Sequence, residues 1–232
     1  MSFQLVQKAV RYQVPVKVAL IGPSGSGKTK SALILCKGFG GKTTLVDTEN
    51  KRGLADADLY DYSYVQFDPP FTPERYVEVI NFAVAQGSNN LILDSASHEW
   101  IGEGGCLEIH TKITQASQSK NSYIAWNTVT PRHNSFINAI IRCPINLIVC
   151  LRGKDEYVLT GDDNKKAPKK VGVGAQTRDG LEYECTVTFI IDAESHFATV
   201  SKDFEGMFRD PGLITEDYGK RLAVWAGSAQ KR

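Results

Sequence analysis

A glycine-rich segment with one lysine and one threonine is the clearest candidate for chemistry in this sequence. Residues 22–29 read GPSGSGKT and match the pattern G-x-x-x-x-G-K-[ST] in full. Glycines let the backbone wrap closely around a phosphate, and successive backbone N–H groups form an anion cradle. We expect Lys28 to contact the β- and γ-phosphates of ATP and the Thr29 hydroxyl to bind Mg²⁺. The expected nucleotide-binding residues are Gly22, Pro23, Ser24, Gly25, Ser26, Gly27, Lys28, Thr29 and Lys30.

Two acidic segments could complete a site that cleaves a phosphate bond. Residues 22–29 form the expected phosphate-binding loop, or P-loop, and the strand before them is the P-loop strand. Asp94 ends the apolar run LILD, and a carboxylate at the end of a strand beside the P-loop strand would hold the magnesium ion. Ser95 follows it, so a catalytic base must come from elsewhere. Glu49 ends the run TLVDTE; if that strand neighbours the P-loop strand, its carboxylate could orient or deprotonate a water. The alternatives are that Asp94 caps a turn and that Glu49 belongs to a solvated acidic pair.

The P-loop needs a strand before it and a helix after it, and the flanking pattern predicts both. Residues 16–21 are apolar except for Lys17, and residues 28–37 have helical periodicity that ends at glycines 38, 40 and 41. Further apolar runs predict strands over 43–47, 63–67, 91–94 and 145–151. Alternating residues predict a hairpin over 184–191 and 196–201. Helices are expected after the N-cap Thr72 and over 105–118, 133–142 and 215–226.

Strands that alternate with helices indicate one α/β domain over residues 1–232. The short, continuously apolar strands are typical of a mostly parallel central sheet with helices on both faces. The late hairpin predicts an antiparallel extension at one edge of that sheet. Residues 161–180 carry glycine, proline and four lysines, and we expect them to form a long, mobile basic loop.

The composition limits the classes of partner and compartment. The chain has 27 Lys plus Arg against 26 Asp plus Glu, so any contact with nucleic acid must come from a local patch. No apolar run approaches the ~18 residues of a membrane helix, and residues 1–13 lack the apolar core of a signal peptide. The expected compartment is the cytoplasm, without a membrane partner.

The cysteines point to neither a metal site nor a disulfide framework. There are five, an odd number, and none forms a C-x-x-C pair. Cys36 and Cys150 lie inside apolar runs and are expected to be ordinary buried thiols.

The order of these motifs resembles the RecA-type recombinase core: a P-loop, a glutamate ending the next strand, then a magnesium aspartate with no glutamate after it. The wider chain is similar to small phage and prophage ATP-binding proteins, including the core-only single-strand annealing proteins of the Sak type. The resemblance covers most of residues 15–225. It rests on ALIGPSGSGKTKSAL, LVDTEN, LILDSASHEW, WNTVTPRHNSFINAII, RDGLEYECTVTFIID and ATVSKDFEG.

The resemblance implies roles for individual residues. Lys28 and Thr29 would serve the P-loop, Glu49 would be the catalytic base and Asp94 the magnesium acid. Arg152 follows INLIVCL, where RecA-like proteins place a polar residue, usually glutamine, that senses the γ-phosphate. Lys202 in SKD matches a basic residue that reaches the nucleotide of a neighbouring subunit. Relatives often read SKDR there, whereas this chain has Phe204 in place of the arginine.

Contact with single-stranded DNA is expected from basic and aromatic residues. RecA-like proteins line the DNA with mobile loops, and a cluster of lysines in such a loop would make binding sensitive to salt. Trp100 could stack a base, although a tryptophan in the core or an interface is an equally good interpretation, and Trp126 is expected to pack in the core. The basic run could also be a solvated loop. The expected DNA-binding residues are Lys165, Lys166, Lys169, Lys170 and Arg178.

These observations favour a Mg²⁺-dependent, DNA-stimulated ATPase in phage recombination, active in annealing or strand pairing. A core of this size would need a homo-oligomeric ring or filament to hold DNA, and a single-strand DNA-binding protein is a possible partner. Two alternatives stay open: a small-molecule kinase on the same fold, and an ATP-gated interaction module such as a helicase loader.

Overall fold

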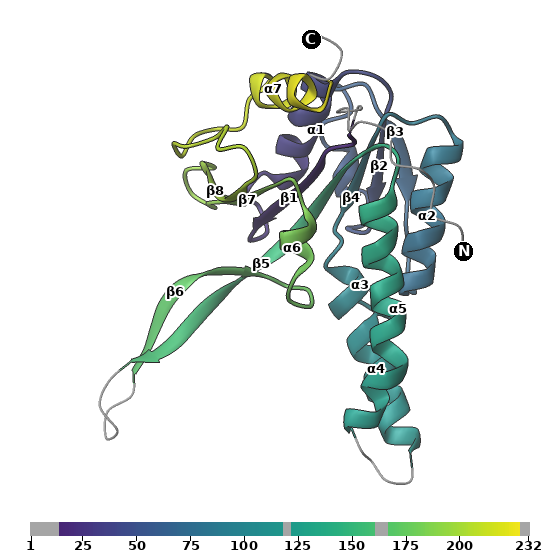
Figure 1. Cartoon of the computed structure of the whole chain (residues 1–232). Helices are drawn as coiled ribbons and strands as arrows, with labels where there is room; N and C mark the ends of the chain where they lie inside the picture. The colour runs from purple at the N-terminus through teal and green to yellow at the C-terminus, as the bar shows by residue number, and fades with distance from the viewer. Residues whose placement is uncertain (1–13, 118–121, 161–166, 228–232) are drawn as a thin grey trace, which may run out of the picture.

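A mostly parallel sheet forms the centre of the computed structural model, which describes residues 14–117, 122–160 and 167–227 (Figure 1). The strands run in the order β3-β2-β4-β5-β1-β7-β8, and β6 pairs with β5 alone. Pairing is parallel from β3 through β7, whereas β8 is antiparallel to β7. The strands are β1 (Lys17–Gly22), β2 (Thr43–Asp47), β3 (Ser63–Gln66), β4 (Asn90–Asp94), β5 (Asn146–Thr160), β6 (Ala167–Ala175), β7 (Val187–Ile191) and β8 (Ala198–Asp203).

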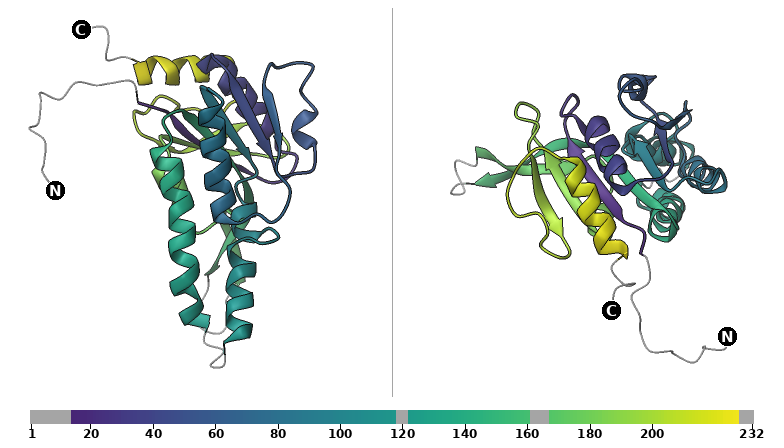
Figure 2. Two further views of the ribbon diagram at one scale, coloured as in Figure 1. Left: turned by 90° about the vertical axis from the view of Figure 1, so that its right-hand side faces the viewer. Right: turned by 90° about the horizontal axis from the view of Figure 1, so that it is seen from above.

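Helices cover both faces of this sheet (Figures 1 and 2). Successive residues of β1 point to opposite faces, so Val18 and Leu20 pack in one core, and Ala19 and Ile21 pack in the other. The first core includes residues of α1 and α7, and the second includes residues of α2 and α5. The predicted α/β class, with its antiparallel hairpin at one edge, is therefore confirmed.

Among the described residues, the five long helices lie over the predicted segments, with some changes of boundary, whereas the short helices η1, α3 and α6 were not predicted. Thr72 caps α2 as predicted, because its hydroxyl accepts a hydrogen bond from the N–H of Arg75 at 3.4 Å. The helices are α1 (Lys28–Phe39), η1 (Arg52–Leu54), α2 (Pro73–Ala85), α3 (His98–Ile101), α4 (Cys106–Ala116), α5 (Ser122–Arg142), α6 (Leu181–Glu184) and α7 (Glu216–Gly227).

Gly38 does not end the first helix but allows a second helix to approach it closely. A Cβ at Gly38 would lie 2.2 Å from the carbonyl oxygen of Glu216 in α7, and a Cβ at Gly219 would lie 2.2 Å from that of Leu35. Neither residue could carry a side chain without moving a backbone. The glycines thus hold α7 against the helix that begins at the P-loop.

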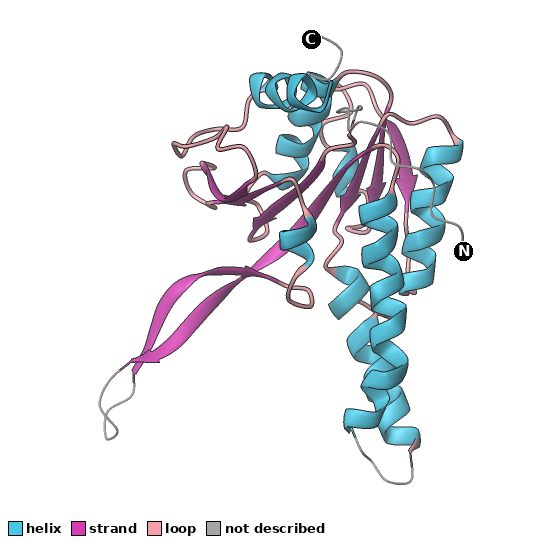
Figure 3. Cartoon of the chain, viewed as in Figure 1, coloured by secondary structure: helices cyan, strands magenta, loops and turns pink. Residues whose placement is uncertain are grey.

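Two hairpins project from the body of the protein (Figure 3). In one, α4 packs beside α5, which begins at Ser122 rather than near residue 133 and passes through Pro131. In the other, β5 and β6 form a two-stranded arm. The prediction of one long loop over 161–180 is wrong for Ala167–Ala175, because their backbone groups pair with β5.

The order of the strands differs from expectation next to the P-loop. β5 and β7 are the neighbours of β1, so the strand that ends at Asp94 does not lie beside the P-loop strand, and neither does the strand before Glu49. β4 pairs instead with β2 and β5, and the registers place Asp47, Asp94 and Cys150 side by side. The acids still meet near the P-loop, because parallel strands end at one edge of the sheet.

The search for membrane spans gave a negative result. Within the described ranges, no helix combines the length and the apolar character that crossing a membrane requires.

All five cysteines are buried and form no disulfide bond, and burial was predicted for Cys36 and Cys150.

Candidate functional site

The P-loop joins β1 to α1 with a backbone that only glycine adopts easily. Gly25 and Gly27 have φ angles of 84° and 89°, in the left-handed region. A Cβ at Gly22 would come within 2.6 Å of the carbonyl oxygen of Ile191 at the end of β7. Gly25 faces open space, since no atom would lie within 4 Å of an added Cβ. The loop is therefore accessible at Gly25, next to the start of α1.

Polar groups of the loop fit a bound phosphate. The ammonium of Lys28 is buried and donates to the carbonyl oxygens of Gly22 at 2.9 Å and Pro23 at 2.7 Å. The buried hydroxyl of Ser26 has no hydrogen-bond partner among the described residues. Pro23 and Ser24 are exposed at the tip of the loop, and Lys30 is exposed in the first turn of α1. A phosphate group would supply acceptors for the loop N–H groups and for Lys28.

Thr29 and Asp94 bring a hydroxyl and a carboxylate together beside the loop. The Thr29 hydroxyl donates to Asp94 Oδ2 at 2.5 Å, although the two residues come from α1 and β4. Burial raises the pKa of Asp94 to about 6, and the hydrogen bond from Thr29 opposes that effect. Hydroxyl and carboxylate oxygens are ligands that Mg²⁺ prefers. The two side chains therefore suit the predicted metal site.

The two acids at the end of β2 have different surroundings. Asp47 is buried, and its carboxylate accepts hydrogen bonds from the backbone N–H groups of Glu49 at 2.5 Å and Gly53 at 2.9 Å. The hydroxyl of Tyr64 donates to it as well, at 3.1 Å. Asp47 thus holds the turn after β2, whereas the side chain of Glu49 is left for other contacts.

Arg152 binds the carboxylate of Glu49. Its Nη2 and Nε atoms lie 2.8 and 3.1 Å from Glu49 Oε1, while Oε2 is 3.5 Å from Arg52 Nη1. Burial alone would raise the pKa of Glu49, but the hydrogen bonds and charge of Arg152 outweigh it and lower the pKa below its ordinary value of 4.5. Glu49 is therefore ionised near neutral pH, as a base must be.

The backbone of Arg152 is fixed on both sides. Its N–H donates to the hydroxyl of Ser97 at 2.9 Å, and its carbonyl accepts from the N–H of Gln176 at 2.7 Å. Beside Ser97, the ring of His98 lies 2.7 Å from the Thr48 hydroxyl. The start of α3 therefore has contacts on both sides of the ion pair. Ser97 bonds to Arg152, and His98 contacts Thr48, the residue before Glu49.

Lys202 lies away from the P-loop of its own chain. It pairs with Thr188 of β7, which pairs with Ala19 of β1, three residues before Gly22. Its ammonium donates to the carbonyl oxygen of Tyr183. The expected contact with a neighbouring subunit's nucleotide stays a prediction.

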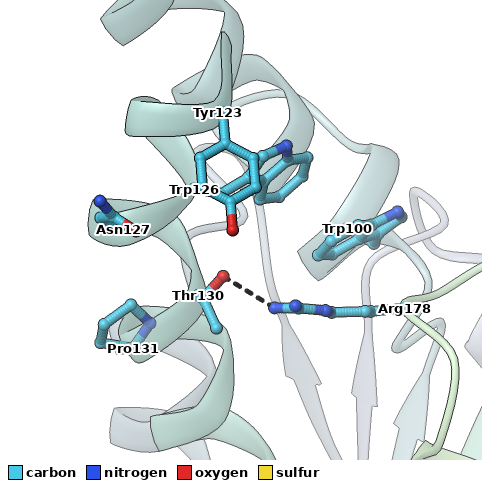
Figure 4. A pocket seen from close by; sticks show the side chains of 7 residues that line it. All are labelled: Trp100, Tyr123, Trp126, Asn127, Thr130, Pro131 and Arg178. Atoms are coloured by element: carbon cyan, nitrogen blue, oxygen red, sulfur yellow. Dashed lines mark hydrogen bonds between the residues drawn. The ribbon is translucent and has the colours of Figure 1, made fainter.

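The residues expected to contact DNA are not gathered in one loop. Lys165 and Lys166 lie outside the described residues, and Lys169 and Lys170 belong to β6, where they pair with Val158 and Tyr157. Arg178 instead turns toward α5 and donates to the Thr130 hydroxyl at 2.9 Å (Figure 4). Trp126 lines a pocket with Trp100 rather than packing in the core as expected.

Sequence reasoning missed a buried cluster beneath that pocket. The thiol of Cys106 donates to Glu99 Oε1 at 3.0 Å, and His133 Nδ1 lies 3.0 and 3.1 Å from the two carboxylate oxygens. These three residue types can bind metals, but the cluster contains no fourth such side chain within the described ranges. Because they already satisfy one another, we interpret the cluster as a hydrogen-bonded network.

His196 is a second residue that the sequence did not single out. It lies in the turn between β7 and β8, and its Nδ1 atom is 3.1 Å from the carbonyl oxygen of Ser26. No short motif contains both residues, which are 170 positions apart. The edge hairpin therefore contacts the P-loop directly.

Comparison with known protein families gives a match that covers most of this chain. A family model described as an AAA domain matches residues 14–211. That range contains the P-loop, Glu49, Asp94, Arg152 and Lys202. No curated protein matches.

Proposed function

Since this chain belongs to the AAA domain family of P-loop NTPases, we propose that it binds and hydrolyses ATP with Mg²⁺ and acts on single-stranded DNA. The observation that carries the first part is the convergence of Lys28, Thr29, Asp94 and Glu49 on one edge of the sheet. These groups come from three separate elements, and together they supply phosphate binding, metal ligands and a base.

Each residue of the proposed site has a defined role in ATP binding or hydrolysis. The loop N–H groups and Lys28 bind the β- and γ-phosphates, with Lys28 exchanging its two carbonyl partners for phosphate oxygens. Thr29 and Asp94 hold Mg²⁺, which when bound neutralises charge on the phosphates. Glu49 accepts a hydrogen bond from the attacking water and orients it. If Arg152 releases Glu49, both carboxylate oxygens become available to the water, and the guanidinium can contact the γ-phosphate.

The proposed action on DNA rests on basic and aromatic side chains and on the resemblance to RecA-type proteins. Arg178, the two lysines of β6 and the two lysines just before β6 supply positive charge. Trp100 supplies a surface on which a base can stack. We propose annealing or strand pairing in phage recombination, by a ring or filament of this chain that works with a single-strand DNA-binding protein. Lys202 would contact the nucleotide of the next subunit.

One observation favours a second function, an ATP-gated interaction module such as a helicase loader. Arg152 binds Oε1 of Glu49 with two hydrogen bonds, so it competes with a water for this carboxylate. If that ion pair persists when ATP is bound, turnover will be slow and the nucleotide will serve mainly to set the conformation.

The test is ATP hydrolysis with and without single-stranded DNA at two salt concentrations. Lys28→Ala is the blank, and Lys37→Ala is a matched control, since Lys37 lies on the same helix in an exposed ion pair with Glu216. We expect DNA to raise the rate of the wild type and the Lys37 variant, less so at high salt. Hydrolysis that Lys28→Ala leaves unchanged would overturn the ATPase assignment. Hydrolysis indifferent to DNA would favour the interaction module.

A further inference from the structure

A pocket of about 510 Å³ lies between α3 and α5, outside the P-loop (Figure 4). In Figure 4, the side chains of Tyr123, Trp126 and Thr130 extend from α5, and Trp100 and Arg178 face them from the opposite side. Pockets of this size are typical of small-ligand sites. Nothing in the ATP chemistry described above uses this pocket.

Two stacked tryptophans line the pocket, and a histidine outside the lining extends their stack. Trp100 and Trp126 lie 5.6 Å apart with an angle of 15° between their planes, and His110 stacks on Trp126 at 4.2 Å. The two tryptophans already stack on each other, so a planar ligand would extend the pair rather than insert into it. Tyr123 lines the same pocket and has four-fifths of its surface exposed.

The buried cluster described above supports one end of this stack. The ring of His133 contacts Trp100 edge to face at 5.1 Å, and His133 is itself bonded to Glu99. Glu99 is only one residue from Trp100 in the chain and is fully buried. The orientation of Trp100 is therefore fixed by packing before any ligand binds, which reduces the entropy lost on binding.

Arg178 gives the pocket a positive charge. It donates to Thr130, and its guanidinium carbon lies 6.0 Å from the centre of the Trp126 ring. One hydrogen bond leaves further N–H groups of the guanidinium for an anionic ligand. Among the described residues that line the pocket, no carboxylate opposes this charge.

We infer that this pocket binds one nucleotide unit of single-stranded DNA, with the base on the Trp100–Trp126 stack and a phosphate at Arg178. Stacking surfaces beside a cation are how proteins hold unpaired nucleotides without reading their sequence. The inference rests on the proposed function, and it names the residues through which DNA would be bound.

The pocket is also connected to the nucleotide site. Ser97, which accepts from the N–H of Arg152, directly precedes the helix that carries Trp100. Gln176, which donates to the carbonyl of Arg152, is two residues before Arg178. Both sides of the pocket are thus bonded to the backbone of the residue that pairs with Glu49. A nucleotide bound here is well placed to influence hydrolysis.

The experiment measures binding of a single-stranded oligothymidylate to the full chain at saturating ATP. Anisotropy of a labelled oligonucleotide gives the affinity, and quenching of tryptophan emission reports contact with the pocket. Two of the three tryptophans line it, and Trp225 on α7 does not. We expect the oligonucleotide to quench the emission of the wild type and of Trp225→Leu.

Three variants test the pocket directly. Trp100→Leu and Tyr123→Ala should each weaken binding by about 5- to 100-fold, the usual effect of losing one base–aromatic stack. Arg178→Gln should weaken binding and reduce its salt dependence by about one ion. Tyr123 is so exposed that its truncation should not affect folding, which protects the test if Trp100→Leu is unstable. Phe204→Ala and Arg209→Gln, after β8, are the matched controls and should bind like the wild type.

The outcomes separate this inference from the proposed function. If the oligonucleotide binds without quenching, and the three variants bind it normally, the pocket assignment is overturned while DNA binding stands. If no oligonucleotide binds to the wild type, both fail. If thymidine monophosphate alone quenches as strongly as an equal concentration of nucleotide units in the oligomer, the pocket is a site for free nucleotides and the inference is again overturned.

Discussion

Arg152 holds Glu49 through two hydrogen bonds to a single carboxylate oxygen, at 2.8 and 3.1 Å. Glu49 lies two residues after β2, and Arg152 lies within β5, where it pairs with Gly22 of β1. Between β2 and β5 lies β4, the strand that ends at Asp94. The ion pair therefore joins residues of the two strands that flank β4, whose last residue is the proposed metal ligand Asp94.

Replacing Glu49 with glutamine should separate ATP binding from hydrolysis. The amide keeps the shape of the side chain but cannot act as a base, so we expect hydrolysis to fall about 100-fold or more while ATP affinity stays close to that of the wild type. Steady-state hydrolysis and equilibrium binding of a fluorescent ATP analogue measure the two effects. Glu78→Gln, on the exposed side of α2, is the control. Unchanged turnover in Glu49→Gln would show that the base lies elsewhere.

The Glu49–Arg152 pair should make stability depend on pH in acid. The folded-state pKa of Glu49 is lower than its ordinary value of 4.5, so the stability that its charge contributes is fully present above that pH. As pH falls through the folded-state pKa, this contribution is lost. Both side chains are partly exposed, and the contribution should be below about 1 kcal/mol.

Urea unfolding of the wild type and Glu49→Gln from pH 7 into acid measures this effect. The difference in unfolding free energy between the two proteins should be constant near neutral pH and should shrink below pH 4.5. A difference that grows as the pH falls would contradict the assignment of the ion pair.

The contact between α1 and α7 should not tolerate a methyl group. A Cβ at position 219 would lie 2.2 Å from the Leu35 carbonyl oxygen and 2.9 Å from the Cα of Gly38, and neither backbone atom can move alone. We expect Gly219→Ala to lower the free energy of unfolding by about 1–3 kcal/mol, against the usual helix preference for alanine. Gly227→Ala at the end of the same helix meets no atom within 4 Å and should be neutral or slightly stabilising. Equal effects of the two substitutions in urea unfolding would refute the close packing.

The buried network below the pocket should contribute more to stability than an exposed ion pair of similar length. Glu99→Ala leaves both Cys106 and His133 without their acceptor in a buried position, and we expect a loss of about 3–5 kcal/mol. Glu74→Ala breaks the exposed 2.7 Å pair with Arg132 and should cost less than about 1 kcal/mol. Thermal unfolding of the two variants, read by tryptophan emission, gives the comparison. Similar costs would mean that the network is not what fixes Trp100.

The P-loop and the fold class could be predicted from the sequence because they depend on local patterns. The glycines, Lys28 and Thr29 lie within eight consecutive residues, and the apolar strands around them are continuous. The order of the strands could not be predicted in this way. Hydrophobic periodicity shows that 91–94 is a buried strand, but it carries no information on whether β1 or β5 pairs with it.

Two segments were predicted wrongly because their amino-acid composition is unusual for the structure that they form. The lysines, glycines and proline of Ala167–Ala175 are typical of a loop, yet their backbone bonds are provided by β5. The helix predicted over 133–142 was too short, because α5 begins at Ser122 and continues through Pro131. The Glu99, Cys106 and His133 network was beyond reach for another reason: its members lie on three helices and follow no spacing rule.

β5 has a mechanical consequence for the whole molecule. It runs without interruption from Asn146 in the sheet, past Arg152, to Thr160 in the arm, and the first irregularity in its pairing falls between Glu156 and Tyr157. A paired strand is stiff along its length, and a bulge is where it bends. The arm and Arg152 therefore belong to one continuous strand, and Arg152 lies on the part of that strand that is in the central sheet. The four residues after Arg152 pair regularly, so a displacement of this part of the arm should be passed along the strand to Arg152, which binds Glu49.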